Sequence, residues 1–173
     1  MIMPRGSDQL LLPVNPLFIG VSLVLALALQ MLPLGRQAAA PDVAALVLVF
    51  WNVYQPLKVG VGLGFALGLL VDVHQGAVLG QHALAYTLMS FFAVALHRRL
   101  LWFPVIEQAV QIVPLLAAGH LVSLAARMAV GGMFPGWGLL AAPLVEAALW
   151  PLVVWLLLAP QRRAPDPDEN RPL

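Results

Sequence analysis

The stretch from Leu57 to Gly80 reads LKVGVGLGFALGLLVDVHQGAVLG, and it decides the fold class of the chain. Glycine recurs in it every fourth residue, with one aspartate in the series, which runs Gly60, Gly64, Gly68, Asp72, Gly76 and Gly80. Because residues four apart lie on one face of a helix, this segment has a stripe without side chains that includes one carboxylate. In a membrane such a stripe lets a second helix approach closely. That second helix belongs either to the same chain or to a partner protein.

The composition excludes an ordinary soluble domain. Of the 173 residues, 61% are hydrophobic and 10% are charged, whereas soluble domains carry about 25% charged residues. The mean hydropathy of the whole chain is +0.90. We therefore expect an all-α, polytopic membrane helix bundle with one transmembrane domain over residues 1–160 and a disordered cytoplasmic tail over residues 161–173. The sequence has no cysteine, and it has no basic patch with interleaved aromatic residues of the kind that binds nucleic acid.

Six apolar segments divide the chain: Val14–Leu32, Val43–Tyr54, Leu57–Val73, Leu79–Leu96, Trp102–Met128 and Trp137–Ala159. A membrane-spanning helix needs about 20 residues, so the second segment is short and could instead be re-entrant. Trp51 and Tyr54 near its end are typical of a membrane interface. Gln55-Pro56 ends it, because the residue before a proline avoids helical backbone angles. The sequence therefore predicts six transmembrane helices, or five if the second segment is re-entrant.

The distribution of lysine and arginine predicts the orientation in the membrane. With six spans and a cytoplasmic N-terminus, Arg36 and Arg127 lie outside, and seven basic residues lie in the cytoplasm: Arg5, Lys58, Arg98, Arg99, Arg162, Arg163 and Arg171. With five spans and the N-terminus outside, Arg5 lies outside and Arg36 lies in the cytoplasm. The ratio of cytoplasmic to outer basic residues is then again seven to two. Both arrangements place the C-terminus in the cytoplasm. A cleaved signal peptide is disfavoured, because the first apolar run exceeds the roughly 7–15 residues of a signal core.

Motifs of catalysis and metal binding are absent from the sequence. It contains no Walker-type phosphate loop, no nucleophile elbow and no His-Glu-x-x-His. His74 and His82 flank the turn around Gly76–Gly80, but no third metal ligand at a suitable spacing accompanies them. We therefore expect no enzyme activity, no metal and no cofactor.

Asp72 and Arg127 fall near the outer ends of their apolar segments, and Glu146 lies deeper, about nine residues into the last one. A charged group at membrane depth costs roughly 2.5–3.5 kcal/mol on insertion scales, and such groups pair with one another or face a cavity. We expect an intramembrane ion pair between Arg127 and Asp72, with Glu146 as the alternative partner of Arg127. A proton or substrate pathway is the other interpretation, although few carboxylates lie in line for a relay.

Two motifs in the middle of the chain carry a family resemblance. Gly68-Leu69-Leu70-Val71-Asp72 is followed by Leu79-Gly80-Gln81-His82-Ala83-Leu84, and the segment Leu11–Pro16, Trp51, Gln55-Pro56 and Gly60 add to the pattern. On these residues most of the chain resembles MreD, the small integral-membrane component of the bacterial rod-shape machinery. The characteristic positions carried over are Gly68, Asp72, Gly80, Gln81 and His82, and their roles are open.

The resemblance implies a membrane scaffold of the cell-elongation complex, needed for rod shape and lateral peptidoglycan synthesis. It implies MreC as the direct partner, with the MreB filament, the RodA glycan polymerase and the elongation transpeptidase alongside. It also implies a bundle similar to the substrate-binding component of energy-coupling-factor transporters. A small-ligand-binding transporter component is therefore the second hypothesis. That function needs polar groups converging in a pocket of a few hundred Å³, whereas a scaffold needs only a packing groove such as Gly60, Gly64 and Gly68.

Overall fold

The computed structural model describes residues 14–32 and 40–162, and within these ranges the chain contains helices and no strand. The α-helices are α1 (Pro16–Met31), α2 (Val43–Tyr54), α3 (Val61–Gln75), α4 (Gln81–Leu101), α5 (Val105–Ala129) and α6 (Ala142–Leu158). Two 3₁₀ turns, η1 (Trp137–Leu140) and η2 (Ala159–Gln161), flank α6. The predicted all-α class is confirmed, and each apolar segment corresponds to one α-helix. Helices α3, α4 and α5 continue past the ends of their segments, α4 the furthest.

Short polar residues fix where the first two helices begin. The side chain of Asn15 accepts a hydrogen bond from the N–H of Leu17 at 2.9 Å, and Pro16 occupies the first helical position of α1. The side chain of Asp42 accepts a hydrogen bond from the N–H of Ala45 at 2.9 Å and caps α2. The helix ends at Tyr54, as Gln55-Pro56 predicts.

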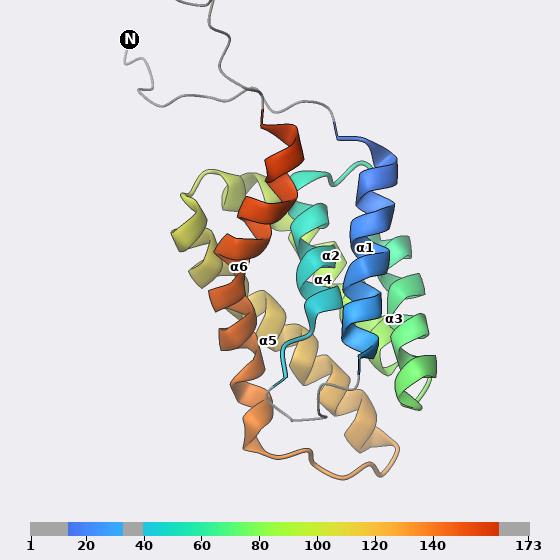
Figure 1. Cartoon of the computed structure of the whole chain (residues 1–173). Coiled ribbons are helices and arrows are strands. Elements are labelled where there is room, and N and C mark those ends of the chain that lie inside the picture. The colour runs from blue at the N-terminus through green and yellow to red at the C-terminus, as the bar shows by residue number, and fades with distance from the viewer. Residues whose placement is uncertain (1–13, 33–39, 163–173) are drawn as a thin grey trace, which may run out of the picture.

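Helix α2 lies at the centre of the bundle (Figure 1), in contact with α1, α4 and α6. Every residue from 44 to 53 is buried. A helix that is apolar on all sides is stable when other elements surround it. Its 12 residues cover about 18 Å at 1.5 Å per residue, well short of the roughly 30 Å of a bilayer core. Helix α2 is therefore a core helix of the protein, and its neighbours separate it from the outer surface.

Trp51 lies in this core and not at a membrane interface. Its side chain is 0% exposed, and its Nε1 donates a hydrogen bond to Oγ of Ser22 on α1 at 2.8 Å. The ring packs edge-on against Phe18 and Phe50. The interpretation of Trp51 as an interfacial residue is wrong, because neighbouring helices enclose this end of α2. Tyr54 is partly buried and donates a hydrogen bond to Oε1 of Gln108 on α5 at 3.2 Å.

The outer surface of the bundle is apolar. On α1, for example, Leu17, Val24 and Leu25 are each more than 60% exposed, which a soluble monomer avoids over large areas. Two helical segments, Val105–Ala129 and Trp137–Gln161, are long and apolar enough to cross a membrane, while α1, α2 and α3 are apolar but shorter. The surface is that of a membrane helix bundle, and the crossing of the bilayer by every helix stays a prediction.

Successive helices run in alternating directions, so the loops gather at two ends (Figure 1). One end, called the basic end below, holds the start of α1, the end of α6, and the basic residues Lys58, Arg98, Arg99 and Arg162. The opposite end, called the acidic end, holds Asp42, Asp72 and the loop between α5 and η1. Arg127 is also near the acidic end, in the last turn of α5.

The structure describes the first two residues of the predicted tail, Gln161 and Arg162. Gln161 belongs to η2, is buried, and donates a hydrogen bond to the carbonyl oxygen of Leu157 at 3.1 Å. The rest of the predicted tail, from residue 163, lies outside the described residues.

Candidate functional site

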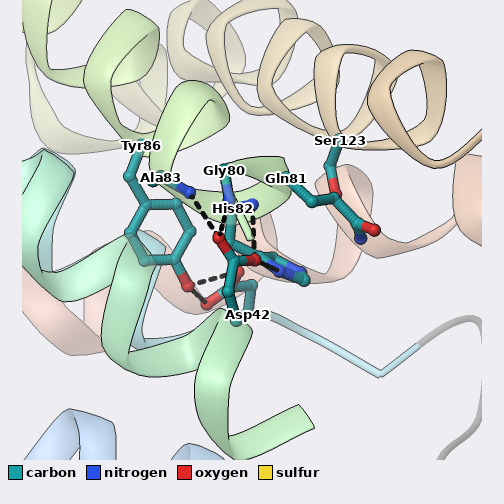
Figure 2. Close-up of polar contacts among 8 residues, drawn as sticks. Asp42, Gly80, Gln81, His82, Ala83, Tyr86 and Ser123 are labelled. Atoms are coloured by element: carbon teal, nitrogen blue, oxygen red, sulfur yellow. Dashed lines mark hydrogen bonds and ion pairs between the residues drawn. The ribbon is translucent and has the colours of Figure 1, made fainter. Parts of the chain in front are cut away.

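The first polar cluster centres on the carboxylate of Asp72, which is 0% exposed. Figure 2 labels the residues that contact it, Gly80, His82 and Ala83. The Oδ1 atom of Asp72 accepts a hydrogen bond from the N–H of His82 and lies against Nδ1 of the same residue, both at 2.8 Å. Its Oδ2 accepts from the N–H of Gly80 at 2.8 Å and from that of Ala83 at 3.3 Å. The first N–H groups of a helix lack partners within it, and its dipole favours an anion there. Asp72, near the end of α3, therefore caps the start of α4.

Two glycines with left-handed backbone angles form the turn between these helices. Gly76, at φ 61°, ends α3, and Gly80, at φ 103°, precedes α4. A side chain is strained at such angles. The carbonyl oxygen of Asp72 accepts a hydrogen bond from the N–H of Ala77 at 3.0 Å, which closes the end of α3. Gly76 and Gly80, the last two members of the series with a spacing of four, therefore form the turn and are not part of a helix face.

Gly64 and Gly68 allow α4 to pack directly on α3. A Cβ at Gly68 would overlap the backbone of His82 and Ala83, and one at Gly64 would overlap Oγ of Ser90 and lie 3.0 Å from the carbonyl oxygen of Tyr86. Gly60 precedes α3 and has open space around it. The helix that occupies the stripe at Gly64 and Gly68 is therefore α4 of the same chain.

The two polar residues that open α4 face different neighbours. Nε2 of Gln81 donates a hydrogen bond to Oγ of Ser123 on α5 at 3.0 Å (Figure 2). The ring of His82 lies edge-on to Tyr86, with a centroid distance of 6.2 Å. All the characteristic residues carried over from the sequence therefore lie in one place, which we call the α3–α4 corner: Gly68, Asp72, Gly80, Gln81 and His82.

A second cluster of polar groups joins the start of α2 to three other helices. Oε1 of Glu146 on α6 accepts a hydrogen bond from the N–H of Asp42 at 2.7 Å and lies 2.8 Å from Nε2 of His120 on α5. The hydroxyl of Tyr86 on α4 donates to the carboxylate of Asp42 at 2.7 Å. Glu146 is 0% exposed, and its Oε2 has no partner among the described residues. We call these four side chains the Glu146 cluster.

Arg127 pairs with neither carboxylate. In the part of the chain that the structure describes, the ion pairs are His82 with Asp72 and His120 with Glu146, each at 2.8 Å. The predicted pairing of Arg127 with Asp72 or Glu146 is therefore wrong. Backbone N–H groups and histidine rings stabilise the carboxylates of Asp72 and Glu146, in place of the guanidinium group that we expected from the sequence. Arg127 stays partly exposed in the last turn of α5, where the helix dipole favours a cation.

Sequence reasoning missed Asp42, Tyr86 and Ser123. Asp42 carried a usable signal, because an aspartate immediately before an apolar run is typical of a helix N-cap. Tyr86 and Ser123 carried none, because the hydrogen-bond partner of a single hydroxyl within an apolar helix depends on which helix packs against it.

The cavities near these clusters are small. One of about 10 Å³ borders Asp42, Tyr86 and His120, which is about the space of one water molecule. A cleft of about 140 Å³ lies between α5 and α6 and borders His120. Within residues 14–32 and 40–162, no group of three or more His, Asp or Glu side chains is arranged to hold a metal ion.

Comparison with known proteins places the chain in a family. The family model of the rod shape-determining protein MreD matches residues 9–159. The chain belongs to the MreD family. The rod shape-determining protein MreD of Haemophilus influenzae (strain ATCC 51907 / DSM 11121 / KW20 / Rd) is 30% identical over 147 residues, which cover 81% of this chain and 88% of the relative.

MreD proteins are rod shape-determining membrane proteins, so the predicted family and its role in cell shape are confirmed. No solved structure matches the chain. The expected likeness of this MreD chain to the substrate-binding component of energy-coupling-factor transporters therefore has no structural match to support it. The five characteristic positions carried over from the resemblance form the α3–α4 corner, where hydrogen bonds join α3 to α4 and α4 to α5.

Proposed function

We propose that the chain is a multi-pass scaffold of the bacterial cell-elongation complex, which acts by binding MreC and so maintains lateral peptidoglycan synthesis. The observation that carries this proposal is the match to the MreD family over residues 9–159. The polar groups add support, because those of the α3–α4 corner and the Glu146 cluster bond mainly to one another and to the backbone. Apart from Oε2 of Glu146, the buried side-chain atoms of these two groups have partners, and buried networks of this kind make a bundle rigid, which is what a scaffold requires.

The proposed topology places the basic end in the cytoplasm. Lys58, Arg98, Arg99 and Arg162 all lie at that end, and cytoplasmic loops carry the excess of lysine and arginine. Both termini are then cytoplasmic, and the α3–α4 corner faces the outer leaflet of the inner membrane. A periplasm-active reporter fused at Ala77, in the α3–α4 turn, should be active, and the same reporter fused after Arg162 should be silent. The reverse pattern would overturn the orientation.

The partner helix of MreC needs a surface other than the glycine stripe. Gly64 and Gly68 are buried against α4, so a partner must pack on the outer apolar surface of the bundle. We propose that the same surface is shared between MreC and membrane lipids. RodA, the elongation transpeptidase and the MreB filament then join through the assembled complex.

A small-ligand-binding component of a transporter is the weaker candidate. Ligand pockets usually enclose about 300–1,000 Å³ with a few convergent polar groups. The cleft between α5 and α6 holds about 140 Å³ and is lined by apolar side chains apart from His120. The scaffold function accounts for the buried polar groups without a ligand.

Affinity purification from membranes tests the proposal. A tagged chain should bring down an MreC-like bitopic protein, and cells depleted of the chain should become round and recover when it is supplied again. Cells that remain rod-shaped without any copy of the chain would overturn the scaffold function. If depleted cells become round but no MreC-like protein co-purifies with the tagged chain, only MreC as the direct partner is ruled out.

A further inference from the structure

The cleft between α5 and α6 has the size of one short apolar group. It holds about 140 Å³ and is lined on α5 by Val113, Ala117 and Leu121, with Leu140 of η1 and Leu144 of α6 opposite. An apolar cavity of about 150 Å³ accommodates a benzene-sized molecule. The cleft therefore has room for a few carbons of a hydrocarbon chain and too little for a typical metabolite.

The cleft is bordered by the outer apolar surface of the bundle. The side chains of Leu121, Leu140 and Leu144 are 53%, 56% and 60% exposed, so these walls continue onto the surface that a membrane would cover. Because η1 and the first turn of α6 lie at the acidic end, the cleft belongs to the leaflet at that end. A group that enters it comes sideways from the bilayer.

His120 gives the cleft one polar feature. It is the only lining residue with a polar side chain, and its Nε2 is held by Oε1 of Glu146 at 2.8 Å. Its Nδ1 has no hydrogen-bond partner in the described chain, and the fully buried side-chain atoms without a partner are Oδ1 of Asn52 and Oε2 of Glu146. Nδ1 of His120 is therefore not fully enclosed, and His120 borders both this cleft and the smaller cavity beside Asp42. We place Nδ1 toward the cleft, where a pure hydrocarbon would leave it without a partner, which is unfavourable.

A phospholipid supplies both an apolar group for the cleft and a polar group for His120. Its acyl chain is the apolar group, and the ester oxygens stand at the head of that chain. Glu146 beside Nε2 allows His120 to carry a proton on each nitrogen, so that Nδ1 can donate to an ester oxygen.

We propose that the cleft between α5 and α6 binds one acyl chain of a phospholipid from the leaflet at the acidic end, with the ester oxygen of that chain at His120. This inference rests on the membrane placement in the proposed function. It assigns the cleft to a structural lipid and not to a transported molecule or to a segment of a partner protein.

Photolabelling of the full chain tests the proposal. The protein is placed in vesicles of phosphatidylethanolamine and phosphatidylglycerol that contain a phospholipid with a diazirine in its acyl chain, and the labelled residues are mapped after irradiation. Label at Val113, Ala117, Leu121 and Leu144 should exceed, several-fold, the label at Ile106 and Val110, which are 75% and 69% exposed on the same helix. Ala117→Phe should abolish that excess by filling the cleft, and Ala118→Phe, at the exposed neighbouring position, should leave it unchanged.

Each alternative result overturns the proposal in a distinguishable way. Equal label at the cleft and at Ile106 and Val110 removes the lipid site while the membrane placement stands. Absence of label from all of α5 removes the membrane placement as well. Loss of the excess when the chain is purified together with MreC assigns the cleft to the partner protein. The ratio in the unsubstituted chain decides the proposal if Ala117→Phe fails to fold.

Discussion

Replacing Asp72 by asparagine should remove a large part of the stability of the bundle. The carboxylate accepts hydrogen bonds from three backbone N–H groups, those of Gly80, His82 and Ala83. An asparagine keeps one acceptor oxygen, and its NH₂ group then faces either the N–H groups of Gly80 and Ala83 or that of His82. With the oxygen toward His82, the buried N–H of Ala83 and the partly buried N–H of Gly80 lose their partner. A buried donor without a partner costs about 1–3 kcal/mol, so the free energy of unfolding falls by at most about 2–6 kcal/mol. Whole domains are stable by only about 5–15 kcal/mol.

Tryptophan fluorescence during denaturant unfolding of the detergent-solubilised protein measures this change. Trp51 and Trp150 are both 0% exposed, so unfolding moves both rings into a new environment. Glu107→Gln is the matched control, because Glu107 is an exposed carboxylate at the start of α5, and it should change the free energy of unfolding by less than about 0.5 kcal/mol.

A double-mutant cycle with Arg127 separates this account from the ion pair predicted from the sequence. Because Arg127 makes no ion pair with Asp72 in the structure, the effects of Asp72→Asn and Arg127→Gln should add to within about 0.5 kcal/mol. Recovery of stability in the double variant would refute the capping account. A loss below about 0.5 kcal/mol for Asp72→Asn alone would refute it too.

The corner and the core make three further predictions for the same unfolding assay. Gly68→Leu should destabilise the free protein strongly, because its side chain would overlap the backbone of α4, while Gly62→Leu, with open space around it, should not; equal effects would refute close packing at Gly68. Gly80→Ala should cost about 1–2 kcal/mol, because φ is 103° there, and an unchanged midpoint would contradict that angle. Ser22→Ala should cost about 1–3 kcal/mol by leaving Nε1 of Trp51 without its acceptor; a neutral result would mean that Nε1 finds another acceptor.

The helices could be predicted from the sequence because they are local features, whereas the corner as a set of five residues followed from the resemblance to the MreD family. Apolar runs and Gln55-Pro56 fix the helices, and the glycine stripe is a pattern within one helix. Gly68 and Asp72 share a helix face, and Gly80 follows in the next turn of the chain. The sequence alone did not reveal which neighbour fills the stripe, because a helix of this chain and a helix of a partner satisfy it equally.

The partners of the buried carboxylates could not be predicted, because they depend on which helix ends meet. The sequence argument considered only charged side chains at similar depth and so chose Arg127. Backbone N–H groups at a helix start are equally good donors, yet every helix has them and none stands out in the sequence. His120 and Glu146 come from helices whose register is set by packing, which periodicity does not give.

The enclosed position of α2 has a consequence for the biogenesis of the protein. Helix α2 is too short to be held in a bilayer by its own length, and Asn52 and its capping residue Asp42 bond to residues that the ribosome makes later. Asn52 donates a hydrogen bond to Ser90 on α4 at 3.0 Å, and Asp42 bonds to Tyr86 on α4 and to Glu146 on α6. The second helix to be synthesised therefore acquires its final surroundings only when the last one arrives. A chain truncated before α6 should hold α2 loosely and be a substrate for membrane proteases, even though every residue of α2 is present.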